Sequence, residues 1–203
     1  MTKPREFTDT REHLLATGEA VFRGKGFTAV GLTEILAAAG VPKGSFYHYF
    51  RSKEGFGVDM LARYFSRYDD DLRALLLEAP GSGRERLLRY FGRWAARCEQ
   101  TETQARDTAC LAVKLSAEVS DLSEPMRAVL VAGMERVQQR LAQTLKAGQQ
   151  DGSLDPALPP EALAAALYQL WVGAELLTKV RRDAQPFACA LQQTQAWLRP
   201  VSP

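Results

Sequence analysis

The sequence predicts an all-α protein of about nine helices. Apolar side chains recur at helical spacing along most of the 203 residues, capping and breaking residues separate the periodic segments, and no run alternates apolar and polar residues as a half-buried strand would. With 46% hydrophobic residues, the chain is able to bury a core of substantial size. We expect a small N-terminal helix-turn-helix domain, residues 1–55, joined by one long helix to a larger C-terminal bundle within residues 56–203.

Three short helices are expected at the N-terminus. The first stops at Gly26, and the second, residues 32–39, ends at Gly40, where a left-handed backbone conformation is easily adopted. Pro42 suits the first turn of the third helix, residues 43–50, because its missing N–H would have no intrahelical partner there.

The remaining helices are longer. A fourth helix is expected after the N-cap Ser52, over residues 53–78, and the sequence Pro80-Gly81-Ser82-Gly83 ends it. Pro125 falls in the first turn of a later helix, and Pro159-Pro160 opens the one after it. The five helical patterns of the C-terminal part cover about residues 84–99, 110–119, 124–150, 161–182 and 186–198.

Composition excludes several classes of protein. No uninterrupted apolar stretch is long enough to span a bilayer, and residues 1–10 lack the apolar run of a signal peptide, so a cytoplasmic protein is expected. Cys98, Cys110 and Cys189 are widely spaced, and only two histidines are present, which predicts neither a disulfide framework nor a metal site. Without a paired nucleophile and base or a Gly-rich phosphate loop, no catalytic residues, no cofactor and no enzyme are predicted.

Residues 32–50, LTEILAAAGVPKGSFYHYF, are typical of a helix-turn-helix that reads double-stranded DNA. Small and polar residues in its leading turn let a short helix enter the major groove, and lysines and tyrosine hydroxyls donate to phosphates. A short turn between helices also occurs in bundles that bind no DNA, but a purely structural helix would not expose tyrosines and a histidine. Phe46 and Phe50, four residues apart, are expected to pack beneath it. The predicted contacts are Lys43, Gly44, Ser45, Tyr47, His48 and Tyr49, with Lys53 at the start of the next helix.

The charge of the chain is small but local. A net charge of +2 is too low for bulk attraction to a polyanion. Residues 1–55 hold eight basic and six acidic side chains, and the remaining residues hold equal numbers, so the whole excess lies beside the predicted reading helix. We expect a few phosphate contacts, doubled in a dimer, with specificity left to residues 43–49.

The segment GFTAVGLTEILAAAGVPKGSFYHYFRSKEGFG, residues 26–57, resembles the DNA-binding region of the tetracycline-repressor family. The resemblance implies a homodimer on a near-palindromic operator, with a variable C-terminal domain for ligand sensing and dimerisation. It also implies the DNA contacts given above and adds Thr33, on the preceding helix. Gly31 departs from the pattern, because many members have Ser or Thr there, and a cap or phosphate contact is therefore not expected at this position.

Residues 110–127, CLAVKLSAEVSDLSEPMR, are similar to members of this family that sense electrophiles and oxidants. Such a sensor needs a reachable and partly ionised thiol. Cys110 begins a helical segment, where the helix dipole favours an anion, and Lys114 lies one turn further on. Lys179 is a second candidate cation. The alternative is that Cys110 is a small buried hydrophobe. Cys98 is expected to be structural, and Cys189, in the last helix, is expected to pack where the resemblance places the dimer interface.

The predicted function is a dimeric repressor that leaves its operator when an electrophile or oxidant modifies Cys110. A second possibility keeps the DNA reader but uses a reversible small hydrophobic ligand in an aromatic pocket of the C-terminal domain. An enzyme acting on electrophiles is a distant third, and no membrane partner is expected. Aromatic side chains at helical spacing are core residues first, and the candidate pocket residues are Tyr64, Tyr68, Trp94, Tyr168 and Trp171.

Overall fold

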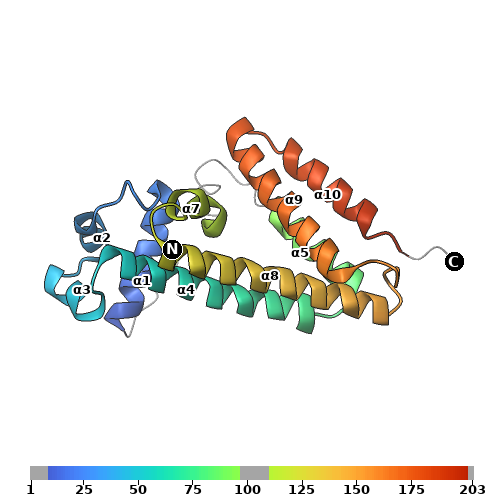
Figure 1. The fold of residues 1–203 in the computed structure, drawn as a ribbon, viewed down its shortest axis with the longest axis horizontal. Helices are drawn as coiled ribbons and strands as arrows, with labels where there is room; N and C mark the ends of the chain where they lie inside the picture. The colour runs from blue at the N-terminus through green and yellow to red at the C-terminus, as the bar shows by residue number, and fades with distance from the viewer. Residues whose placement is uncertain (1–8, 97–109, 201–203) are drawn as a thin grey trace, which may run out of the picture. The chain divides into compact units, whose positions relative to one another are not determined.

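The structure is a computed structural model that describes residues 9–96 and 110–200, and it is shown in Figure 1. Within these ranges it contains nine α-helices, one π-helical segment and no strand, which confirms the predicted all-α class. None of the described helices is both long enough and apolar enough to cross a membrane.

The first three helices follow the predicted punctuation closely. They are α1 (Thr10–Lys25), α2 (Leu32–Ala39) and α3 (Lys43–Tyr49). The Asp9 side chain accepts the backbone N–H of Arg11 at 2.8 Å and caps α1. Gly26 and Gly40 have φ angles of 90° and 64°, and they end α1 and α2 in backbone conformations that a side chain would strain.

The fourth helix begins as predicted and changes its winding near its end. Helix α4 (Lys53–Leu72) continues without a break into η1 (Arg73–Glu78), a π-helical segment. Ser52 accepts the backbone N–H of Gly55 at 3.0 Å, which satisfies one of the open donors at the start of α4.

Five further helices form the rest of the described chain. The end predicted near residue 99 for the first of them lies outside the described residues. The others begin and end within one or two residues of the predicted positions. They are α5 (Gly83–Ala96), α7 (Leu111–Val119), α8 (Glu124–Gln150), α9 (Pro160–Arg181) and α10 (Gln185–Trp197).

The chain divides into two compact units that are not continuous in sequence. The N-terminal unit comprises the described residues up to Phe65 together with Cys110–Val131, and the C-terminal unit comprises the other described residues. Helices α1–α3 and α7 therefore belong to one unit, although about 60 residues of chain separate α3 from α7. Helices α4 and α8 each contribute to both units.

The C-terminal unit is built around aromatic rings. The ring centroids of Phe91 and Trp171 lie 4.9 Å apart at an interplanar angle of 23°, and Phe187 lies 5.6 Å from Trp171. The indole N–H of Trp171 donates to the hydroxyl of the fully buried Thr194 at 2.9 Å. This hydrogen bond satisfies a polar group inside an otherwise apolar core.

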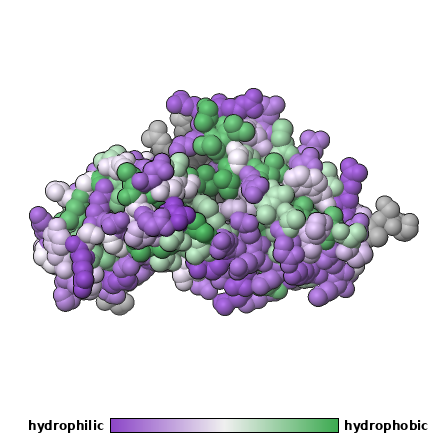
Figure 2. All heavy atoms as spheres, in the orientation of Figure 1, coloured by the Kyte–Doolittle hydropathy of each residue, from purple (hydrophilic) through white to green (hydrophobic). Residues whose placement is uncertain are grey.

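One part of the surface of this unit is apolar. Leu176, Leu177 and Val180, all on α9, expose 55%, 51% and 72% of their surface. In Figure 2, hydrophobic surface gathers over the part of the molecule that holds α9 and α10. Contiguous exposed apolar side chains on a folded chain commonly mark an interaction surface.

Candidate nucleic-acid interface and thiol site

Helix α3 rests on a cluster of phenylalanines. Phe46 is fully buried on its underside, and its ring centroid lies 5.2 Å from that of Phe50 and 5.4 Å from that of Phe56 at the start of α4. The prediction that Phe46 and Phe50 pack beneath the helix is therefore confirmed. Such a cluster holds a seven-residue helix that would not be stable alone.

The outward side of α3 carries the residues predicted to meet DNA. Tyr47 and Tyr49 expose 51% and 36% of their surface, and Lys43, Gly44 and His48 are exposed as well. The ammonium of Lys43 lies 5.9 Å from the ring centroid of Tyr47. Ser45 is half-buried, and Thr33 is exposed on α2.

Gly44 is not required by the packing of the protein itself. A Cβ atom placed on it would meet nothing within 4 Å, and its backbone angles are ordinary helical ones. Glycine weakens a helix by about 1 kcal/mol relative to alanine. A glycine at an exposed position with open space around it leaves room for a partner surface to approach the backbone closely.

Lys53 differs from the other predicted contacts, because its ammonium is directed into the N-terminal unit. Its Nζ donates to the carbonyl oxygen of Phe27 at 2.6 Å and lies 4.3 Å from the centroid of the Phe27 ring. Burial lowers the pKa of Lys53, against an opposing effect from Glu118. A phosphate contact by Lys53 stays a prediction, and it would compete with this bond.

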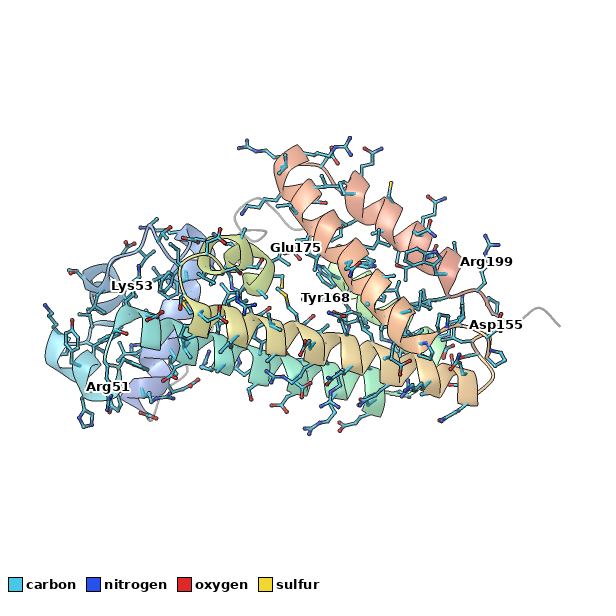
Figure 3. The ribbon with its side chains drawn as sticks, viewed as in Figure 1. Arg51, Lys53, Asp155, Tyr168, Glu175 and Arg199 are labelled. Carbon is cyan, nitrogen blue, oxygen red and sulfur yellow. The ribbon has the colours of Figure 1, made fainter. Side chains whose placement is uncertain are left out.

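Arg51 is a basic residue that the sequence analysis did not select. It is exposed, and it lies in the short connection between α3 and α4 (Figure 3). Its position directly before the N-cap Ser52 was the available signal, since a guanidinium beside a helix start is well placed for a phosphate.

Cys110 occupies the N-cap position of α7 and is 8% exposed. Its Sγ lies 3.4 Å from the hydroxyl oxygen of Tyr64, on α4. The guanidinium carbon of Arg23 lies 5.8 Å from the centroid of the Tyr64 ring, so a cation from α1 is close to the residue that contacts the thiol. The thiol thus lies within hydrogen-bond distance of a hydroxyl group, with either group able to donate, at the N-terminus of a helix.

The lysines predicted to assist Cys110 lie in different units. The Nζ of Lys114 donates to the carbonyl oxygens of Arg23 and Gly24, the second at 2.8 Å, at the C-terminal end of α1. Lys179 is exposed on α9 of the C-terminal unit. Cys189 is exposed on α10, whereas Cys98 lies outside the described residues.

The five candidate pocket residues are divided between the two units. Tyr64 belongs to the N-terminal unit, and the other four belong to the C-terminal unit. Trp94, Tyr168 and Trp171 are buried in its core, with the centroids of Trp94 and Trp171 5.6 Å apart. Polar ends are satisfied there: the hydroxyls of Tyr68 and Tyr90 lie 2.9 Å apart, and the Trp94 indole donates to Glu175 at 2.8 Å. A ligand pocket at these residues stays a prediction.

A hollow of about 350 Å³ lies elsewhere, and most of the residues that line it are polar. Its lining residues come from α8 and from the start of α9, where Lys146 and Glu161 form an ion pair with an N–O distance of 2.5 Å. Among residues 9–96 and 110–200, no group of three or more His, Cys, Asp or Glu side chains is placed to hold a metal ion. The hollow is lined by Glu135, Gln138, Gln139, Ala142, Gln143, Lys146 and Glu161.

Comparison with known proteins gives consistent matches along the chain. Residues 14–56 match the family described as "Bacterial regulatory proteins, tetR family", and residues 83–194 match the family described as "Tetracyclin repressor-like, C-terminal domain". The chain is 47% identical over 187 residues to the HTH-type transcriptional repressor NemR of Escherichia coli K12, covering 90% of each protein. It is 36% identical to the repressor DhaR of Mycobacterium sp. GP1, covering 88% of this chain and 87% of that one.

A solved structure shows the same fold. The crystal structure of the reduced form of E. coli NemR superposes with a TM-score of 0.85 at 45% sequence identity, covering 96% of this chain and 99% of that chain. The relatives are named as transcriptional regulators and not as enzymes. With a helix-turn-helix on a phenylalanine core and matches over both halves of its length, the chain is a DNA-binding regulator that belongs to the tetR family.

Proposed function

We propose that this protein is a dimeric transcriptional repressor that binds operator DNA through α2 and α3 and is released when an electrophile or oxidant modifies Cys110. The observation that carries the DNA-reading part is the outward side of α3, where Lys43, Tyr47 and His48 are exposed above a buried phenylalanine cluster. The observation that supports the sensing part is the contact of the Cys110 thiol with the Tyr64 hydroxyl.

Each group on the reading side has a separate role in the proposal. Gly44 lets the backbone of α3 come close to the bases, and Lys43 donates to a base edge or a nearby phosphate. The hydroxyls of Tyr47 and Tyr49 and the guanidinium of Arg51 donate to phosphates, which fixes the register of the helix without reading sequence. Thr33, Ser45 and His48 complete the proposed contact set.

DNA reading is tested first by selecting bound duplexes from a random pool and then by comparing variants on the selected duplex. We expect K43A to weaken binding by about 1–3 kcal/mol, which is the usual cost of losing one such contact. The matched control is K146A, which removes an exposed lysine from α8 in the C-terminal unit. Equal affinities of K43A, K146A and the unaltered protein would refute the role of α3.

Dimerisation is part of the proposal because one α3 reads only one half-site. A two-fold dimer presents two such helices to half-sites about one helical turn apart. The exposed leucines and valine of α9 support this surface as the dimer contact, since burying them against a second copy removes apolar area from water.

The proposed chemistry at Cys110 is simple. The thiolate adds to the double bond of an electrophile such as N-ethylmaleimide, a C–S bond forms, and the resulting carbanion takes a proton from water. With hypochlorous acid, the thiolate gives up two electrons, the sulfur becomes a sulfenic acid and chloride leaves. Because Cys110 is only 8% exposed, an added group has to displace its neighbours, and α7 begins at the next residue.

The sensing role is tested in a protein whose other two cysteines are replaced, C98S/C189S. We expect N-ethylmaleimide to release this protein from the selected duplex and to leave the same protein with C110S bound. Release that is equal in both would exclude Cys110. Release of the C110S protein that dilution reverses would indicate a non-covalent ligand.

Lys114 and Lys179 are proposed to favour the thiolate of Cys110. Lys179 is the better position for a test, because Lys114 also donates to carbonyls of α1. We expect K179M to slow alkylation of Cys110, with the exposed Lys146 on α8 as the control position. An unchanged rate in K179M would remove Lys179 from the proposal.

A further inference from the structure

The last turn of α7 holds the loop between α1 and α2. The carboxylate of Glu118 accepts the backbone N–H of Phe27 at 3.0 Å, and it also accepts the backbone N–H and the side-chain hydroxyl of Thr28. All three donors lie in the loop that leads into α2, about 90 residues earlier in the chain. Glu118 and the loop belong to the same compact unit.

A second residue of α7 contacts the end of α1. Lys114, one turn before Glu118, donates from Nζ to the carbonyl oxygens of Arg23 and Gly24. An ammonium on the last carbonyls of a helix complements the negative end of its dipole. Two successive turns of α7 therefore place the ammonium of Lys114 at the end of α1 and the carboxylate of Glu118 at the N–H and O–H donors of the loop that follows α1.

The backbone at Gly26 makes this arrangement possible. Its φ is 90°, and a Cβ atom there would lie 2.8 Å from a carboxylate oxygen of Glu118. A side chain at this position would be strained and would also push the carboxylate away. The loop has therefore the one residue type that allows Glu118 to approach the amides of Phe27 and Thr28.

The electrostatics of Glu118 agree with a specific contact. Burial alone would raise the pKa of Glu118, but the hydrogen bonds from Thr28 and Phe27 and the charge of Lys53 lower it on balance below its usual value of 4.5. Lys53, at the start of α4, donates to the carbonyl of the same Phe27. The loop is thus held by α7 on its N–H groups and by α4 on a C=O group.

We infer that Glu118 is a positioning residue for DNA reading, because it fixes the loop from which α2 and then α3 depart. The inference also deepens the proposed function and rests on it in one respect: Cys110 is the N-cap of the same helix. A group added to Cys110 that displaces α7 would carry Glu118 and Lys114 away from α1 and the loop. Operator affinity and the state of Cys110 are then coupled through α7, and such coupling is reciprocal.

The experiment measures two quantities for each variant: the operator Kd of the reduced protein, and the factor by which N-ethylmaleimide raises that Kd. The variants are E118A, which removes the carboxylate, and T28V, which removes only the hydroxyl donor of Thr28. The control is E124Q, which neutralises an exposed carboxylate of α8. In the structure this carboxylate forms an ion pair with Arg127, on the same helix. Thermal unfolding verifies that each variant folds.

We expect E118A to raise the Kd of the reduced protein about tenfold and to reduce the effect of N-ethylmaleimide by a comparable factor, within the range of measured couplings. T28V should shift both quantities in the same direction by less, since it keeps the backbone N–H groups. The E118A/T28V double variant should resemble E118A, because the two residues act through one contact. E124Q should match the unaltered protein.

The reduction in the effect of N-ethylmaleimide separates positioning from simple loss of stability. A variant that is only less stable would bind less but would respond to the reagent by the unaltered factor. If E118A and T28V keep both the Kd and the factor of the unaltered protein, the inference is wrong. If the unaltered protein itself fails to respond to the reagent, the proposal for Cys110 is wrong, and the Kd of the reduced variants still decides the role of Glu118.

Discussion

Tyr64 is the residue of α4 that contacts the Cys110 thiol. Its hydroxyl oxygen lies 3.4 Å from the Cys110 sulfur, and its ring lies beside the guanidinium of Arg23. Arg23 in turn pairs with Glu19 at 3.0 Å, and Glu19 pairs with Arg63 at 2.7 Å. Modification of the Cys110 thiol would therefore disturb contacts between α1 and α4 as well as the start of α7.

The first prediction concerns the hydroxyl of Tyr64. In the C98S/C189S protein, Y64F should slow alkylation of Cys110 by N-ethylmaleimide about fivefold, because the thiolate loses a hydrogen bond whose typical net value is about 1 kcal/mol. The rate is measured by mass spectrometry of the adduct over time. Y68F is the control, since its hydroxyl contacts that of Tyr90 in the C-terminal unit. Faster alkylation of Y64F would show that the hydroxyl shields the thiol.

For single residues, the sequence predicts which side chains are exposed better than it predicts which groups the long side chains contact. The exposure of Lys43, Tyr47 and His48 follows from helical spacing within α3, which is local information. A phosphate contact by Lys53 and a role of Lys114 beside the thiol stay predictions, and in the structure their ammonium groups donate to Phe27 and to the end of α1. A flexible side chain chooses its partner from the tertiary structure, and spacing along the chain does not contain that partner.

At the scale of elements, caps and breakers predict most of the helix boundaries. Gly26 and Gly40 act where they were expected, because their effects are local to the backbone. The π-helical segment at Arg73–Glu78 was predicted as ordinary helix, since a wider winding has no separate signal in the apolar pattern. The fold class was thus readable from the sequence, whereas this change of winding was not.

The second prediction compares two glycines of α5. A Cβ atom on Gly83 would lie 2.3 Å from the backbone nitrogen of Gly148, so α5 begins in direct contact with the end of α8. G83A should destabilise the C-terminal unit by about 1–3 kcal/mol, because backbone has to move. G92A, where a Cβ meets nothing within 4 Å, should stabilise the same helix by about 0.5–1 kcal/mol.

Urea unfolding followed by tryptophan fluorescence measures both changes, because all three tryptophans lie in the C-terminal unit. Equal effects of the two substitutions would mean that α5 and α8 do not approach as closely as described.

The third prediction concerns the ion pair between α4 and α8. Arg140 donates from two nitrogens to both carboxylate oxygens of Asp69, each at 2.9 Å, and these bonds lower the pKa of Asp69 below its usual value of 3.8. A lowered pKa means that the folded state favours the charged form, so the stabilisation is present above pH 3.8 and is lost as the pH falls through the folded-state value.

D69N should therefore lower the free energy of unfolding by about 1–2 kcal/mol at pH 7, a value reduced for partial exposure. The difference between D69N and the unaltered protein should shrink towards pH 3. Urea unfolding at both values of pH measures it. A difference that stays constant would show that the charge of Asp69 does not contribute.

At the scale of the whole molecule, the apolar side of α9 is the surface that the proposed dimer would cover. Val180 is 72% exposed, so V180E should not disturb the folded chain, but it would place a charge from each copy in the proposed apolar contact. We expect V180E to sediment as a monomer and to bind operator DNA more weakly. The control is V131E on α8, a valine that is 42% exposed, which should remain dimeric.

The two units show what a linear reading of the chain leaves out. The boundary predicted near residue 55 follows the chain, and it remains a prediction for the DNA-binding domain. The compact N-terminal unit also includes Cys110–Val131, because Ser123 donates to Glu54 at 2.6 Å and Gly57 packs closely against Met126. Contacts between segments so far apart in sequence require knowledge of the fold.

The N-terminal unit is made of two chain segments, and this constrains how its operator specificity could be exchanged for that of a relative. A chimaera that takes only its first 65 residues from a relative would combine a new loop at Phe27 and Thr28 with the original Glu118 and Lys114. Those partners match only if both segments come from one parent. To give this regulator the operator specificity of a relative, two segments therefore have to be replaced together: the first 65 residues and Cys110–Val131.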